Sequence, residues 1–512
     1  MKSPSIRSSK RKVRVKQPIG SSEFYDVIVV GGGPAGSVMA WSLSKQGINV
    51  LLLERARFPR EKVCGDFIEP RGLRILDKLG CLASLEKTAP LPITSVAMFV
   101  GSQCSYRGSI PFYGLRNDLP PHGYIIPRDV LDDQVLKCAA KAGAIIREET
   151  TVKTVDTTER GVNITAQHGT KNITYRAQLV VGADGVNSVV AKNAGLRQSD
   201  PRYIAVSQRA YAGELSNVSG EAAFFFDRDF FPGYAWLFPM ASGKANIGVG
   251  ILSETRDRYQ INVPELFREF VEKLRRTHPR CADLHVTSRP IGGIVKTYGG
   301  IGKNYFNRGI LIGDAGCFVD PMTGEGITSA MESALIGSSI LTAAIEKGQY
   351  DAAFLSSYQQ RFREYFDPAM CYVDLCASLM RNRHFSDSWL NAVARGCELA
   401  VQDPSFAKTT GATFGGMEID PFHISTQIWA KTTGELATLG THSLFGLVTG
   451  NTNTMFGACS DLVALQANWW SSIVSDPVWH MSWASDISQK WLKLMTCMSA
   501  GTKDPRASGI LQ

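Results

Sequence analysis

Three glycines near the N-terminus have the spacing that brings a backbone turn close to a pyrophosphate. Gly31, Gly33 and Gly36 form a Gly-x-Gly-x-x-Gly pattern between an apolar run, residues 25–30, and a helical run, residues 34–46. Gly31 allows the tight turn, Gly33 lets the backbone approach a phosphate, and Gly36 lets the helix pack on the strand. The pattern predicts a phosphate-binding turn between a strand and a helix.

An acid follows the next apolar run. Residues 48–53 are apolar and end at Glu54, about 20 residues after the glycines, where a carboxylate can accept hydrogen bonds from a ribose diol. Strand, helix, strand and acid in this order predict a βαβ unit that binds a dinucleotide. Free N–H groups at the helix N-terminus would face the phosphates. Pro34, Ala35 and Arg55 are the further cofactor-binding residues predicted here.

Composition describes an ordinary globular protein with a basic end. The 512 residues are 44% hydrophobic and 20% charged, which is typical of a soluble chain with a large core. Of the net charge of +8, +7 lies in residues 1–22, which hold seven bases and no acid, whereas the rest has 48 bases and 47 acids. The nearly balanced charge of the rest of the chain therefore gives no indication of a nucleic-acid partner. The tail lacks the apolar run of a secretory signal, which leaves organelle targeting, contact with anionic lipid and a solvated disordered end open.

Cysteines and histidines show no pattern for a metal site or a disulfide framework. The 11 cysteines and 8 histidines are scattered without a CxxC or HExxH pattern, which favours reduced thiols and no bound metal. No uninterrupted run of about 18 apolar residues is present, so we expect no transmembrane segment. We expect a cytoplasmic protein, with peripheral membrane contact and the oligomeric state left open.

Two further motifs each follow an apolar run. Gly182-Ala-Asp184-Gly185 follows residues 179–181, and Gly313-Asp314-Ala-Gly is followed by Asp320-Pro-x-x-Gly-Glu-Gly-Ile327. Together with the glycine turn, these motifs resemble the three signatures of the class of FAD proteins that includes para-hydroxybenzoate hydroxylase. The resemblance covers residues 25–350 and implies FAD, bound non-covalently because no motif identifies a flavin-linking residue.

The resemblance also implies roles for individual residues. Asp314 would hold the ribityl hydroxyls of FAD, and Gly324 and Gly326 would let the backbone approach the isoalloxazine ring. The helix that starts there would direct its positive end at the flavin. Arg128, near the start of an amphipathic helix predicted over 124–140, is either an FAD contact or a surface arginine. The cofactor-binding residues implied are Arg128, Asp184, Gly185, Gly313, Asp314, Pro321, Gly324, Gly326 and Ile327.

The implied fold class is α/β, with a Rossmann-type FAD-binding domain, an inserted antiparallel β-sheet substrate domain and a mostly helical C-terminal region. The FAD-binding domain is expected to be discontinuous. The expected boundaries are 1–22 for the disordered basic tail, 23–95, 124–200 and 296–350 for the FAD-binding domain, 96–123 and 201–295 for the β-sheet domain, and 351–512 for the helical region.

Two local patterns narrow the branch of flavoproteins. Cys64-Gly65-Asp66 follows the first βαβ unit, and Tyr234-x-Trp236-x-Phe-Pro precedes a Gly-x-Gly. These resemble the geranylgeranyl reductase family, FAD enzymes that saturate carbon–carbon double bonds of prenyl chains. The resemblance implies Cys64, Gly65, Tyr234 and Trp236 at the flavin and the substrate, although Cys64 could be buried packing and the aromatic residues could be core. Many members of that family have a second glycine at the position where this chain has Asp66.

Reductase, monooxygenase and halogenase remain alternatives that share these FAD motifs. Flavin-dependent halogenases carry Trp-x-Trp-x-Ile-Pro and a lysine between flavin and substrate, whereas this chain has Arg74 at the corresponding spacing. An FAD-dependent monooxygenase acting on a specialised metabolite also stays open. For a reductase, the hydrophobic or prenyl substrate would receive hydride from reduced flavin. No second Gly-x-Gly-x-x-Gly follows a strand, so NAD(P)H or ferredoxin would supply electrons without a Rossmann domain of its own.

Overall fold

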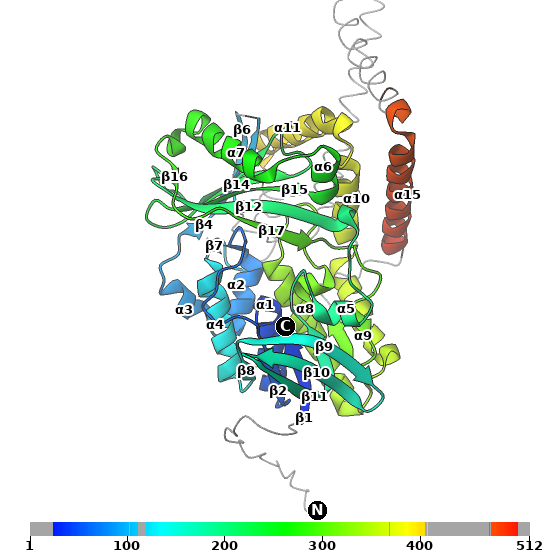
Figure 1. The fold of residues 1–512 in the computed structure, drawn as a ribbon. Helices are drawn as coiled ribbons and strands as arrows, with labels where there is room; N and C mark the ends of the chain where they lie inside the picture. Colours follow the sequence, from blue (N-terminus) through cyan, green and yellow to red (C-terminus); the bar gives the residue numbers. More distant parts are fainter. Residues whose placement is uncertain are drawn as a thin grey trace, which may run out of the picture.

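The computed structural model describes residues 24–101, 103–110, 119–367, 369–404, 407, 471 and 473–499. The expected basic tail and most of the segment 405–470 lie outside the described residues. Two eight-stranded sheets form the body, and Figure 1 shows the sheet that begins with the N-terminal strand below the second sheet.

The first sheet contains the predicted βαβ unit. β1 (Phe24–Val30) pairs in parallel with β2 (Val50–Leu53), and α1 (Pro34–Lys45) connects them. Residues 27–30 of β1 and all of β2 are Val, Ile or Leu, which is the pattern of parallel strands covered on both faces. The order is β18 (Tyr305–Phe306), β19 (Gly309–Leu311), β11 (Lys171–Gly182), β1, β2 and β8 (Ile145–Arg147), with β10 (Gly161–His168) and β9 (Thr150–Thr158) continuing from β11.

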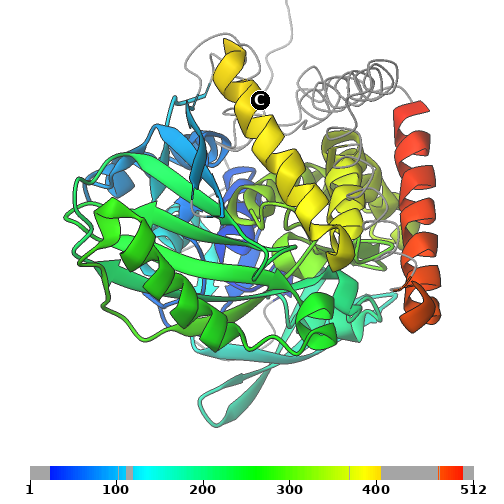
Figure 2. The same cartoon turned by 90° about the horizontal axis from the view of Figure 1, so that it is seen from above.

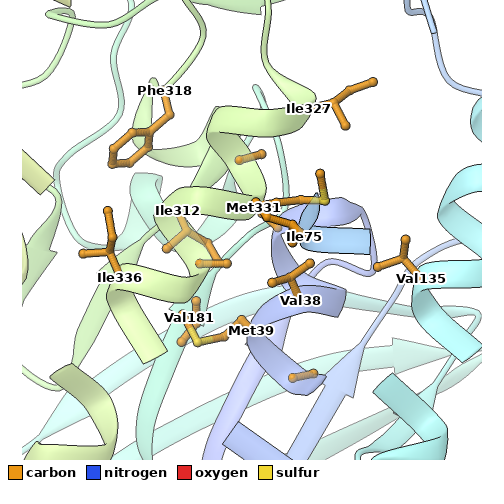
Figure 3. Close-up of a cluster of buried hydrophobic side chains, with 14 of the residues drawn as sticks. Val38, Met39, Ile75, Val135, Val181, Ile312, Phe318, Ile327, Met331 and Ile336 are labelled. Atoms are coloured by element: carbon orange, nitrogen blue, oxygen red, sulfur yellow. The ribbon is translucent and has the colours of Figure 1, made fainter. Parts of the chain in front are cut away.

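The core of this part lies between the sheet and its helices. α8 (Ile327–Lys347) packs against α1, and Figure 3 shows Val38, Met39, Ile312 and Met331 meeting between these helices and the sheet. Among the described residues α8 is the helix long and apolar enough to cross a membrane, but 72% of that stretch is buried inside the protein. α8 therefore has the environment of a core helix.

The helix predicted over residues 124–140 starts later than expected. Gly123–Ile125 form strand β7, and the helix α4 spans Arg128–Lys141. Pro127 is the N-cap residue, because proline has no N–H to donate inside a helix and disfavours helical backbone at the preceding residue. The prediction was wrong for the first turn, and Arg128 becomes the first residue of the helix.

The second sheet is antiparallel in all but one pairing. Its order is β16 (His285–Val286), β12 (Ile204–Gly213), β15 (Ala245–Leu252), β14 (Tyr234–Pro239), β13 (Glu221–Phe226), β5 (Ser95–Val100) and β6 (Gln103–Ser109), with β17 (Ile291–Lys296) beside β12. β5 and β13 pair in parallel, which the sequence did not predict. α7 (Val263–Thr277) covers one face of the sheet (Figures 1 and 2).

Alternation along β14 decides which side chains face α7. Ala235 and Leu237 belong to the core beneath α7, whereas Tyr234, Trp236 and Phe238 belong to the cluster on the other face. Successive side chains of a strand point to opposite faces. The predicted aromatic motif is therefore placed as one row on the face away from α7.

A third sheet and several short helices complete this part of the fold. The third sheet contains β3 (Phe67–Ile68), β7 and β4 (Pro92–Ile93). The short helices are α2 (Pro70–Lys78), α3 (Leu82–Glu86), α5 (Val189–Asn193), α6 (Ser253–Arg258), η1 (Pro201–Tyr203), η2 (Pro279–Cys281), η3 (Gly313–Gly316) and η4 (Arg383–Phe385).

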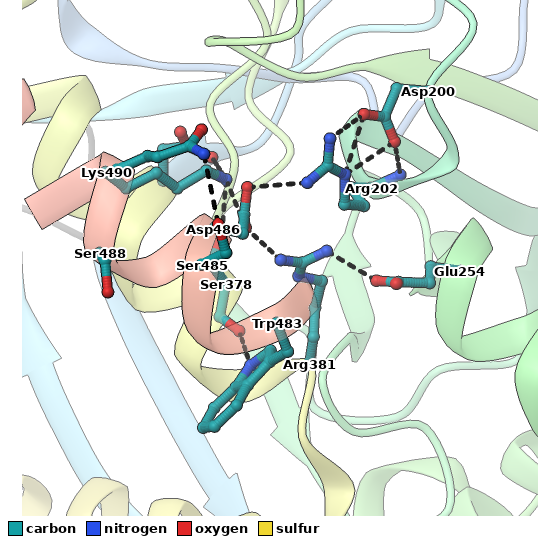
Figure 4. Close-up of polar contacts among 12 residues, drawn as sticks. Asp200, Arg202, Glu254, Ser378, Arg381, Trp483, Ser485, Asp486, Ser488 and Lys490 are labelled. Carbon is teal, nitrogen blue, oxygen red and sulfur yellow. Dashed lines mark hydrogen bonds and ion pairs between the residues drawn. The ribbon is translucent and has the colours of Figure 1, made fainter. Parts of the chain in front are cut away.

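The described C-terminal region is helical, as expected. It consists of α9 (Ala352–Phe366), α10 (Ala369–Met380), α11 (Ser386–Gln402) and α15 (Pro477–Ser499). Figure 4 shows how α15 is held: Asp486 pairs with Arg202 and Arg381, and Arg381 also pairs with Glu254 at 2.7 Å. Lys490 pairs with Asp374 at 2.7 Å. These ion pairs hold α15 against α10, η1 and α6.

Candidate active site

The glycine turn packs differently at each of its three glycines. Gly31 has φ +103°, and a Cβ there would lie 2.3 Å from the carbonyl oxygen of Ala183. A Cβ at Gly36 would lie 1.9 Å from the carbonyl oxygen of Gly31. At Gly33, the atom that a Cβ would meet within 4 Å is Nη2 of Arg60, at 3.7 Å. Of the three, Gly33 alone leaves room for a group outside the chain.

Glu54 directly follows β2, and its carboxylate holds the glycine turn in place. Its Oε2 accepts a hydrogen bond from the N–H of Gly32 at 2.6 Å, and its Oε1 accepts one from the N–H of Ala56 at 2.8 Å. Each oxygen keeps a further lone pair for a ribose hydroxyl. Arg55 is exposed. No side chain caps the N-terminus of α1 at Gly33, so its first N–H groups can bind an anion.

A large cavity runs from this turn and is lined by both sheets. The structure brings together in its lining the predicted residues Gly33, Pro34, Ala35, Cys64, Gly65, Arg128, Gly185, Tyr234, Trp236, Asp314, Pro321, Gly324, Gly326 and Ile327. The predicted residues Gly31, Gly36, Glu54, Arg55, Asp184 and Gly313 do not line it. The cavity thus joins residues from the glycine turn to residues near the end of the predicted FAD-binding segment.

The carboxylate of Asp184 is used inside the protein. It accepts hydrogen bonds from Oγ of Ser188 at 2.5 Å and from the N–H of Val189 at 2.6 Å. These contacts fix the start of α5. Asp184 therefore supports the turn that carries Gly185 to the cavity, and its contacts do not show the direct cofactor contact that the resemblance implied.

Asp314 reaches the cavity from η3 and pairs with a lysine. Its Oδ2 lies 3.1 Å from Nζ of Lys62, whose side chain is 41% exposed. The lysine is therefore free to move if the carboxylate accepts ligand hydroxyls. At the nearby start of α8, the carboxylate of Glu325 accepts the N–H groups of Thr328 and Ser329. Part of the positive end of α8 that we expected to serve the flavin is neutralised by Glu325.

Cys64, Gly65 and Asp66 form a loop held by side chains of the second sheet. Asn246, fully buried, donates from Nδ2 to the carbonyl oxygen of Cys64 and to Oδ2 of Asp66, both at 2.9 Å. The hydroxyl of Tyr211 donates to the same Oδ2 at 2.6 Å. Asp66 has φ +63°, a conformation that aspartate tolerates better than most residues, which is how it replaces a glycine here.

Burial changes the proton affinity of both acidic side chains in this loop. It raises the pKa of the Cys64 thiol, and the guanidinium of Arg128 opposes that rise. It also raises the pKa of Asp66 to about 6, although the Tyr211 hydroxyl and Arg209 favour the carboxylate. Cys64 therefore faces the cavity as a neutral thiol at neutral pH.

The aromatic row of β14 forms an apolar wall of the cavity. Tyr234 and Trp236 have ring centroids 6.0 Å apart, and Trp236 and Phe238 are 6.2 Å apart. The Tyr234 hydroxyl donates to the carbonyl oxygen of Thr323, and Trp236 Nε1 donates to Oδ1 of Asn246 at 2.9 Å. With the polar atoms of Tyr234 and Trp236 occupied in this way, the row offers apolar ring carbons to a ligand in the cavity.

Sequence reasoning missed Asn246, Tyr211 and Glu69. Asn246 lies two residues before Gly248, so the two-residue period of a strand places both residues on the same face of the sheet. Tyr211 and Glu69 belong to no motif, and no local signal marks them. Glu69 lines the cavity and is 7% exposed.

One further group of potential ligands lies away from the cavity. Asp367, Cys371 and Cys497 have ligand atoms within 4.8 Å of one another. The ammonium of Lys493 interacts with Cys371 and Asp367, so a positive charge is already present. The expectation of no metal site stays a prediction. The ten cysteines in the described part of the chain are all free thiols.

Comparison with known proteins agrees with this geometry. The family described as FAD binding domain matches residues 24–370. Digeranylgeranylglycerophospholipid reductase 2 of Methanopyrus kandleri is 30% identical over 383 residues, which cover 73% of this chain and 90% of the relative. The chain belongs to the geranylgeranyl reductase family of FAD-dependent oxidoreductases.

Solved structures show the same fold in this family and beyond it. A geranylgeranyl bacteriochlorophyll reductase-like protein from Thermoplasma acidophilum superposes with a TM-score of 0.64 at 22% identity, covering 73% of this chain and 92% of that one. The flavin-dependent halogenase CmlS superposes with a TM-score of 0.60 at 21% identity, covering 74% and 72%. The fold alone therefore does not separate reductase from halogenase.

The residues present fit the FAD that this family binds. Gly33 is open where a Cβ could stand, and the uncapped start of α1 suits the pyrophosphate. Glu54 and Asp314 are the residues that would accept the ribose and ribityl hydroxyls, since each has carboxylate oxygens with lone pairs for hydroxyl donors. The open turn at Gly324, whose nearest neighbour to a Cβ is the Tyr234 hydroxyl at 3.5 Å, suits a flat ring.

Proposed function

We propose that this reductase saturates carbon–carbon double bonds in the prenyl chains of a lipid. The observation that carries the proposal is that the glycine turn, Cys64 and the aromatic row of β14 line the same cavity. An apolar wall beside the cofactor site suits a hydrocarbon chain better than a polar metabolite. The relative from Methanopyrus kandleri is named for a digeranylgeranyl lipid, which supports this substrate class.

Bound FAD, once reduced, would supply the hydride. The chain's own residues would then position the double bond: Trp236 and Tyr234 by contact with the apolar chain, and Gly65 by close packing. A Cβ at Gly65 would lie 3.0 Å from the ring of Phe238, so the loop rests directly on the aromatic row. Cys64 would orient the double bond as a neutral thiol.

We propose non-covalent FAD and an electron donor that binds transiently, either NAD(P)H or ferredoxin. A lipid substrate also implies peripheral contact with a membrane surface. The halogenase alternative is weakened by the position of Arg74, the residue at the spacing of the halogenase lysine, because it does not line the cavity.

Anaerobic turnover with a defined lipid tests the proposal. Photoreduced, FAD-loaded protein is mixed with digeranylgeranylglycerophospholipid in detergent micelles, and the lipid is analysed by mass spectrometry. We expect a gain of two hydrogen atoms for each double bond reduced, together with reoxidation of the flavin. A gain of oxygen under air, or a halide-dependent mass increase, with no gain of hydrogen would contradict the proposal in favour of the monooxygenase or halogenase. Protein without FAD is the matched control.

A further inference from the structure

Four carboxylates share one guanidinium at the edge of the cavity. Arg71, on α2, pairs with Oε2 of Glu69 at 3.0 Å and with Oε1 of Glu332 at 2.8 Å. Asp320 and Glu325 also interact electrostatically with Glu69. If all four buried carboxylates were ionised, the one positive charge of Arg71 would leave a net negative charge among them. Their mutual repulsion therefore favours a proton on at least one of them.

Three of these carboxylates have donors that stabilise their charge. Oδ1 of Asp320 accepts the N–H groups of Met322 and Thr323 at 2.7 and 2.8 Å. Glu325 accepts the N–H groups at the start of α8. Both oxygens of Glu332 contact Arg71, and Tyr365 donates to Oε1 at 2.9 Å. Such donors favour the charged form of a carboxyl group.

Glu69 has much weaker support for a charge. It is the N-cap residue of α2, yet its side chain makes no capping hydrogen bond. Its described ion pair is the one from Oε2 to Arg71. Burial raises the pKa of Glu69 to about 8, and the nearby charge of Glu325 contributes to the rise. Burial also raises the pKa of Asp320 and of Glu325, but the N–H groups that each accepts oppose that rise. The Glu69 carboxylate accepts no such N–H group in the described contacts, so we infer that Glu69 holds a proton at neutral pH.

The ionisable groups of the cavity differ in what binds them, and the described ion pair of Glu69 is the one to Arg71. Asp66 is bound by Tyr211 and Asn246, and Asp314 is paired with Lys62. Glu69 lines the cavity with Cys64, Tyr234 and Trp236. A charge on Glu69 contributes to raising the pKa of the Tyr234 hydroxyl. A neutral carboxylic acid beside an apolar wall is a suitable proton donor.

We propose that Glu69 is the acid that protonates the double bond. This inference rests on the proposed function. The O–H bond of Glu69 breaks and a C–H bond forms at one carbon, while the hydride from reduced FAD forms the C–H bond at the other. The alkene is reduced by two electrons and the flavin is oxidised by two. Glu69 is left as a carboxylate paired with Arg71 until solvent returns the proton.

The proton on Glu69 can be observed without turnover. Infrared titration of the oxidised, FAD-loaded protein should show a protonated carboxyl band that is lost around pH 8 in the wild type and is missing from Glu69→Gln. Glu332→Gln is the matched variant, because Glu332 contacts Arg71 but does not line the cavity. It should keep the band and shift its loss to lower pH, since one negative neighbour is removed. A wild type without a carboxyl group titrating in this range would overturn the inference, whatever the variants do.

Turnover gives the second test. Reoxidation of reduced flavin by digeranylgeranylglycerophospholipid is followed in a single turnover from about pH 6 to about pH 10. In the wild type the rate should fall as pH rises through the pKa of Glu69, because the acid loses its proton. Glu69→Gln should retain FAD, react about 100-fold or more slowly, and lose this dependence on pH.

The two tests also separate this inference from the proposed function. Glu69→Gln that reacts at the wild-type rate, or slowly with the same fall at high pH, would overturn the role of Glu69 alone. Wild-type protein that never reduces the lipid would overturn the proposed function and, with it, the catalytic role.

Discussion

Replacing Gly33 with valine should weaken FAD binding while leaving the fold intact, because binding and folding depend on different atoms at this position. The backbone of Gly33 has φ −70° and ψ −176°, which valine can adopt. A Cβ would meet the end of Arg60 at an ordinary contact distance of 3.7 Å. The rest of the valine side chain would stand in the open space above the helix start, where we place the pyrophosphate.

The expected magnitudes follow from these contacts. Glycine is a better helix N-cap than valine, so the change costs about 1 kcal/mol of folding free energy and lowers the Tm of a chain of this length by only about 1 °C. Forcing extra methyl groups against a bound ligand resembles overpacking, which costs about 1–3 kcal/mol. The Kd for FAD should therefore rise roughly 5- to 150-fold.

The Kd is measured by titrating apoprotein with FAD and following flavin fluorescence. The Tm is measured by thermal unfolding of the same preparation. Gly33→Ala should show a smaller loss of affinity, because it adds only the Cβ. Gly36→Ala is the opposite control and should unfold the protein, since its Cβ would lie 1.9 Å from the carbonyl oxygen of Gly31. Wild-type FAD affinity in Gly33→Val would refute the placement of the pyrophosphate. A large loss of Tm without FAD would refute the claim that this position is free of packing.

Three more outcomes are expected. Cys64→Ser should keep FAD and fold but lower single-turnover flavin reoxidation by about tenfold or more, or about 1.4 kcal/mol; unchanged reoxidation with a lower Tm would make Cys64 structural. Tyr211→Phe removes the 2.6 Å hydrogen bond to Asp66, and the free energy of unfolding should fall by about 1.5–3 kcal/mol where Asp66 is charged. Because the pKa of Asp66 is about 6, denaturant unfolding should show a smaller loss near pH 5 than near pH 7.5, and equal losses would exclude a charged partner. Acid precipitation should release yellow flavin into the supernatant, whereas colour in the pellet would indicate a covalent link.

The sequence alone predicted the parts of the fold whose information is local. The glycine turn, the strands on either side of it and Glu54 are encoded by short spacing and by continuous apolar runs. Alternation along β14 placed Tyr234 and Trp236 on one face for the same reason. The start of the helix at Arg128 was also encoded locally, by Pro127, but the apolar period extended past it and gave the wrong boundary.

Only the tertiary structure decided which polar groups meet. Asn246 contacts the Cys64 loop across 182 residues of sequence, and Arg71 contacts Glu332 across 261 residues. Such pairings leave no period in either segment, because a single buried side chain is selected by its partner and not by its neighbours in the chain. Asp184 is a further example of what the sequence could not show. Its motif indicated a ligand contact, but its carboxylate accepts a hydrogen bond from the N–H of Val189 at the start of α5. Periodicity fixes which face a residue occupies, whereas burial beside particular charges fixes whether a carboxyl group such as that of Glu69 holds a proton.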